Sequence, residues 1–161
     1  MGAVTILYYL TKQYYWNNLH SGTTIRAVVL DSPFANMQKL MYEVGSSKIS
    51  LPDFVFAPVV NSIMERITMK LGFNLLKELD LIDRVKQLKE KNIDSYKLMG
   101  KISALFITSL EDKLVNSSHV EALHQHYPFH PNDLHYFNGQ HNDNRSDNLK
   151  NKCAQFLCEI P

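Results

Sequence analysis

The sequence predicts an α/β fold built on a parallel sheet of about three strands. Three short apolar segments, at residues 25–30, 103–108 and 133–138, have the length and the β-branched content typical of buried strands. Helical patterns separate them, and a helix between successive strands requires a crossover that makes the strands parallel. With 161 residues, 45% of them apolar and 20% charged, we expect one globular domain over residues 1–161.

The first elements in chain order are a helix and a strand. Residues 2–19 are rich in large apolar side chains and predict a buried helix. The strand IRAVVL at 25–30 is nearly all apolar, as expected for a strand covered on both faces. It ends at Asp31-Ser32-Pro33, because proline has no N–H to donate to a sheet.

Residues 35–100 predict a helical, lid-like insertion between the first two strands. Met37, Leu40, Met41 and Val44 have helical spacing, the stretch 52–71 is amphipathic around Pro58, and 75–89 alternates apolar and charged residues with a period near that of a helix. We expect three or four helices here.

The remaining elements are two strands and two helices. SALFIT at 103–108 is the second strand, and Ser118 with Glu121 fits a capping box that begins a helix to about Tyr127. DLHYFN at 133–138 is a weaker third strand, and 146–159 predicts the last helix.

An acid and a base follow two of these strands. Asp112 comes after the second strand and His141 after the third. Functional residues of parallel sheets gather at the carboxyl ends of the strands, so the two side chains are expected to meet there. A carboxylate in that position can fix the imidazole tautomer and stabilise the imidazolium.

The whole chain resembles the C-terminal portion of an α/β-hydrolase, of the serine aminopeptidase-like and esterase group. Four matches occur in order. Met1-Gly2-Ala3 matches the end of the G-x-S-M-G-A nucleophile elbow, and Val29–Phe34 matches the sixth-strand segment. Ala104–Ile107, followed by Glu111–Val115, matches the acid strand and loop, and Gly139–Asn142, with Arg145 nearby, matches the histidine loop.

The resemblance implies a serine hydrolase that cleaves an ester, thioester or amide in a small-molecule or peptide acyl substrate. Asp112 would be the triad acid and His141 the general base, with no cofactor. Met1 would follow the nucleophile and donate its backbone N–H to the oxyanion hole. No G-x-S-x-G occurs in the chain, so the serine and the N-terminal half of the fold would lie upstream of Met1. Ser109 stands where the family usually has glycine, and we expect it to strain the turn before Asp112.

Two alternatives concern activity. In the first, the chain is part of a serine hydrolase, and the 161 residues alone would be inactive because the serine is missing. In the second, the chain is a non-catalytic half-domain or interaction module. Ser32 also stands at the end of a strand, but it lacks flanking glycines and precedes Pro33, which favours a turn residue over a nucleophile.

The sequence gives little support for binding of nucleic acid, an anionic membrane surface or a metal ion. The net charge of +1 gives no case for nucleic acid or an anionic membrane surface. His124 and His126 lie two apart, the wrong spacing for a shared metal on a helix, and aromatic residues at 8–16 suit packing better than base stacking without a basic patch.

The sequence also favours a cytoplasmic protein. No stretch reaches the ~20 apolar residues of a membrane span, and no signal peptide is recognisable. Cys153 and Cys158 are expected to be free thiols. Peripheral membrane contact by residues 51–64 stays as an alternative.

Overall fold

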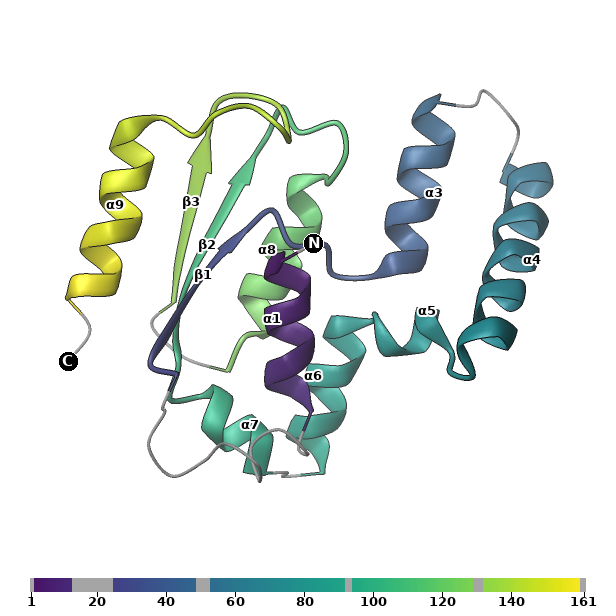
Figure 1. The fold of residues 1–161 in the computed structure, drawn as a ribbon, viewed down its shortest axis with the longest axis horizontal. Coiled ribbons are helices and arrows are strands. Elements are labelled where there is room, and N and C mark those ends of the chain that lie inside the picture. The colour runs from purple at the N-terminus through teal and green to yellow at the C-terminus, as the bar shows by residue number, and fades with distance from the viewer. Residues whose placement is uncertain (1, 13–24, 49–52, 92–93, 129–131, 160–161) are drawn as a thin grey trace.

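A computed structural model describes residues 2–12, 25–48, 53–91, 94–128 and 132–159. Helices and strands alternate as the sequence predicts (Figure 1). In chain order they are α1 (Gly2–Thr11), β1 (Ala27–Asp31), α3 (Met37–Lys48), α4 (Asp53–Leu71), α5 (Leu75–Glu78), α6 (Leu81–Glu90), α7 (Asp94–Met99), β2 (Ser103–Ser109), α8 (Ser117–His126), β3 (Asp133–Phe137) and α9 (Asp147–Cys158).

The three described strands form one parallel sheet in the order β1-β2-β3, which confirms the predicted fold class. Leu105 of the central strand pairs with Val29 on one side and with Asp133 on the other. Residues 104–109 of β2 are all buried, because neighbouring strands flank β2 and helices cover both of its faces.

Two helical layers cover the sheet, and alternate residues of β2 point into them. Phe106 packs with α1, α6 and α8 in the larger core, where the Tyr127 ring meets it edge to face at 5.5 Å between centroids. Leu105 and Ile107 face the other way and pack against Leu149 of α9.

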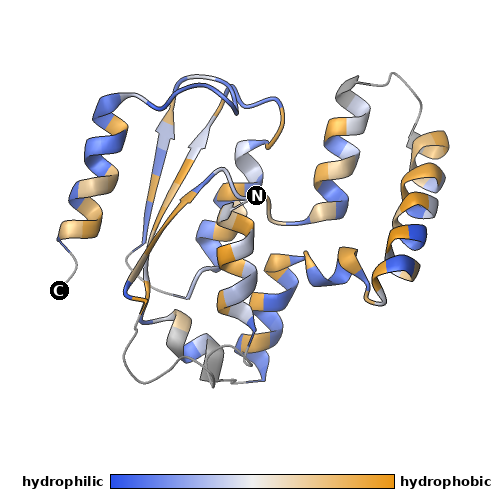
Figure 2. Ribbon diagram, viewed as in Figure 1, coloured by the Kyte–Doolittle hydropathy of each residue, from blue (hydrophilic) through white to orange (hydrophobic). Residues whose placement is uncertain are grey.

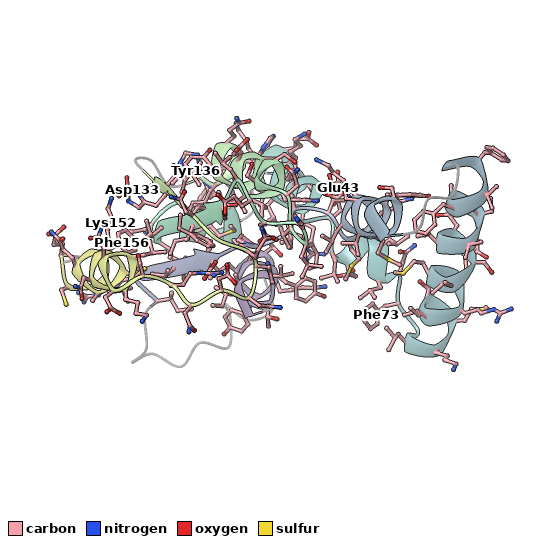
Figure 3. All side chains as sticks on the ribbon, turned by 90° about the horizontal axis from the view of Figure 1, so that it is seen from above. Glu43, Phe73, Asp133, Tyr136, Lys152 and Phe156 are labelled. Atoms are coloured by element: carbon pink, nitrogen blue, oxygen red, sulfur yellow. The ribbon has the colours of Figure 1, made fainter. Side chains whose placement is uncertain are left out.

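The insertion is only partly separate from this body. Residues 37–99 hold five described helices, more than the expected three or four. The later helices α6 and α7 pack against α1, and α6 also packs against α8, so they belong to the core. By contrast, α3 and α4 extend away from the sheet as an arm (Figures 1 and 3).

Three helix boundaries differ from the sequence prediction. The expected helix over 75–89 is divided into α5 and α6, because the Asp80 side chain accepts the N–H of Asp83 and begins a new helix. The helix expected at Ser118 begins one residue earlier and is capped by Asn116, whose side-chain oxygen Oδ1 accepts the Ser118 N–H. The first helix ends at Thr11, and the rest of the predicted 2–19 segment lies outside the described residues.

Hydrophobic residues recur along α4 (Figure 2), and several of their side chains are exposed to solvent. Val60 and Met64 are buried, whereas Phe54 is 79% exposed and Met69 74% exposed. Within the described residues, no helix has both the length and the apolar character needed to cross a membrane.

Candidate active site

The Asp112 carboxylate is fixed in the loop that follows β2. Its Oδ1 atom accepts two backbone N–H groups, from Leu114 at 2.8 Å and from Val115 at 2.9 Å. The side chain is 0% exposed. These bonds hold the carboxylate in one orientation and leave Oδ2 for another donor.

His141 supplies that donor from the loop that follows β3. Its Nδ1 lies 2.8 Å from Asp112 Oδ2, and because a carboxylate accepts only, Nδ1 carries the proton. In the neutral ring Nε2 is then unprotonated, and among the described residues it has no hydrogen-bond partner. The His141 side chain is 26% exposed. The structure thus brings together the two side chains that the sequence singles out, with His141 Nδ1 bonded to the Asp112 carboxylate.

Side chains at the end of β2 clamp the acid loop to the histidine loop. Ser109 Oγ donates to the Gly139 carbonyl at 2.7 Å and accepts the Glu111 N–H at 3.0 Å. Glu111 in turn accepts the Gly139 N–H at 3.1 Å. Both backbone polar groups of Gly139 are therefore bonded to the acid loop, which sets the distance between Asp112 and His141.

This clamp corrects the expectation that Ser109 strains its turn. Among the described residues other than glycine, Ser32 alone has a positive φ, so the Ser109 backbone is ordinary. Its hydroxyl instead makes two hydrogen bonds that glycine cannot make. The sequence signal was a serine where the resemblance leads one to expect glycine, but only the structure shows its hydrogen bonds.

Arg145 connects the histidine loop to the end of β1. It donates to both oxygens of Asp31, from Nε at 2.8 Å and from Nη2 at 3.1 Å, and Nη2 also donates to the His141 carbonyl at 3.0 Å. Asp31 and Arg145 are 114 residues apart, so no local pattern predicts this pair.

The two remaining candidate residues are Ser32 and Met1. Ser32 is buried at the end of β1, and its hydroxyl donates to Asp31 Oδ1 at 3.0 Å, while no hydrogen bond joins it to His141 among the described residues. Met1, the predicted oxyanion-hole donor, lies outside the described residues.

Three other histidines among the described residues have structural partners. His119 is fully buried on α8, where Nδ1 accepts the Ala35 N–H at 3.1 Å and Nε2 donates to Glu43 at 3.0 Å. His124 and His126 lie near backbone carbonyl oxygens, those of Asn132 and Ala122. Within the described part of the chain, no three histidine, cysteine or carboxylate side chains are grouped so that they could hold a metal ion.

Comparison with known proteins supports the fold. An esterase from Pyrococcus furiosus superposes with a TM-score of 0.54 over 99% of this chain, at 16% sequence identity. The chain spans 50% of the length of that esterase. No family model matches the sequence, and no curated protein matches it.

Proposed function

We propose that this chain carries the acid and the base of a serine hydrolase of the serine aminopeptidase-like and esterase group. The observation that carries the proposal is the 2.8 Å contact between His141 Nδ1 and the buried carboxylate of Asp112. The substrate class is an ester, thioester or amide. The nucleophilic serine would come from chain that precedes Met1, in agreement with the chain's matching half of a longer esterase.

In the proposed mechanism, His141 Nε2 removes the proton of the serine hydroxyl as that oxygen attacks the acyl carbon. Asp112 keeps the Nδ1–H tautomer in place and stabilises the imidazolium that forms. The same imidazolium then protonates the leaving alcohol, thiol or amine, which produces an acyl-enzyme. Water activated by His141 releases the acid. The backbone N–H of Met1 would stabilise the oxyanion.

A fluorophosphonate probe, which reacts with activated serines, tests this proposal. The chain would be produced both as 161 residues and with the residues encoded upstream of Met1. We expect labelling of the extended protein at a serine immediately before Met1, loss of labelling in His141→Ala, and no labelling of the 161-residue form. An extended protein that is not labelled, or labelling that survives His141→Ala, would refute the assignment of His141 as the base.

A non-catalytic role is the second candidate. In the described sheet β1 pairs with β2 only, so its other edge is available to a further strand. A half-domain of this kind would associate with a partner along β1 and would react with no serine probe. Labelling of the extended protein separates the two candidates.

A further inference from the structure

We infer that Arg145 and Asp31 position the proposed base, His141, relative to the carboxyl end of β1. Neither residue is assigned a role above, and neither is expected to touch a substrate. The inference rests on the proposed function only in calling His141 a base, since the contacts themselves are properties of this chain.

The Arg145 guanidinium donates four hydrogen bonds to neighbouring residues. Besides its two bonds to Asp31 and its bond to the His141 carbonyl, Nη1 donates to the Asp143 carbonyl at 2.6 Å. The Arg145 Cζ atom lies 4.0 Å from the centroid of the Phe137 ring at the end of β3. One side chain, 18% exposed, therefore holds two carbonyls of the histidine loop, the ring at the end of β3 and the carboxylate at the end of β1.

Asp31 is itself held in place, so it serves as a fixed point. Ser32 Oγ donates to Asp31 Oδ1, and Ser32 N–H donates to the Ile107 carbonyl at 2.9 Å. Ser32 has φ +48°, a left-handed conformation that disfavours residues with a Cβ. Such strain persists only where the surrounding contacts over-determine the conformation, and it directs the Ser32 hydroxyl to Asp31.

The Asp112 bond and the Arg145 bond restrain His141 at two different places. Asp112 fixes the ring through Nδ1, whereas Arg145 fixes the backbone carbonyl of the same residue. Together the two restraints determine the direction of Nε2. With only one of them, the imidazole could rotate about the remaining contact. Lysine would keep the positive charge but lacks the planar fork that reaches a carboxylate and a carbonyl together.

The test is nuclear magnetic resonance of the His141 imidazole in the 161-residue chain labelled with ¹⁵N. In the native chain we expect the Nδ1–H tautomer and slow exchange of that proton with water. In Arg145→Lys and in Asp31→Asn we expect exchange about tenfold faster, equivalent to the loss of one hydrogen bond to a charged group. Lys150→Ala is the matched control, because it removes an exposed ion pair to Asp147 that does not contact the histidine loop.

Unchanged tautomer and exchange in both variants would overturn the inference, and so would an equal acceleration in Lys150→Ala. If Arg145→Lys does not fold, the exchange rate can still be measured in Asp31→Asn. That variant is expected to fold, because Asp31 is 40% exposed and asparagine has the same shape. The readout does not depend on a serine. Failure of the fluorophosphonate experiment with a positive result here would leave the positioning pair intact and remove only the hydrolase assignment.

Discussion

Two neighbouring hydroxyl groups at the end of β2 should respond to removal with opposite signs. Ser109 and Thr108 are both fully buried. Ser109 Oγ makes the two hydrogen bonds that clamp the acid loop to the histidine loop. Thr108 Oγ1 has no hydrogen-bond partner among the described residues. Burial is thus the same at the two positions, and only the hydrogen bonding differs.

The expected magnitudes follow from this difference. Ser109→Ala removes two hydrogen bonds, each worth about 1 kcal/mol net, so it should lower the free energy of unfolding by about 2 kcal/mol. Thr108→Val replaces an unpaired hydroxyl with a methyl group of the same shape, which should raise the free energy of unfolding by about 1 kcal/mol. The two variants should therefore differ by about 3 kcal/mol.

Urea unfolding followed by circular dichroism measures both values on the same chain. Thermal melts give a second reading, since 1 kcal/mol corresponds to about 3 °C for a domain of this length. Equal destabilisation by the two substitutions would show that the Thr108 hydroxyl has a partner in solution. A Ser109→Ala variant as stable as the native chain would show that the clamp contributes nothing, and would remove the structural reason for serine at this position.

Two further predictions concern the same region and the arm. The His119 pKa is lowered, chiefly by burial, against the opposing effect of Glu43. The unfolded chain therefore takes up the proton first, and stability should fall as the pH drops below 6.5, by up to about 1.4 kcal/mol per pH unit. His119→Asn keeps an acceptor for the Ala35 N–H but does not titrate. Its free energy of unfolding should therefore differ less between pH 7.5 and pH 5.5 than that of the native chain. An unchanged difference would assign the pH dependence to another group. Gly139→Ala should lower stability by about 1 to 2 kcal/mol, because φ is +132° and the new Cβ would lie 3.0 Å from an Asp143 carboxylate oxygen. A variant as stable as the native chain, in the same urea assay, would contradict this strain.

The sequence was sufficient for the strands and for the meeting of Asp112 and His141, because each depends on a local signal. Ile25–Leu30 and Ser103–Thr108 are apolar runs of strand length, and each candidate side chain stands directly after a strand. Parallel order then places Asp112 and His141 at one edge of the sheet with no further information.

What the sequence could not supply is the set of contacts between distant segments. The partners of Arg145 and His119 lie 114 and 76 residues away, and nothing in the spacing selects Asp31 or Glu43 from the other carboxylates. The division of the insertion also escaped prediction. Amphipathic helices look alike whether they pack on the body, as α6 does, or extend from it, as α4 does.

The contacts that hold His141 in the structure come from this chain itself. Among the described residues, Asp112 accepts hydrogen bonds from Leu114 and Val115, which follow β2, and from His141, which follows β3. Arg145 connects the histidine loop to Asp31 at the end of β1. On the proposed function, the serine would come from chain that precedes Met1. In the described sheet β1 is an edge strand, so a strand added there would pair along β1. On the inference above, Asp112 and Arg145 would already orient the base that this serine meets. The fluorophosphonate experiment then tests where the serine lies, while the resonance experiment tests the orientation of the base, and each result can stand without the other.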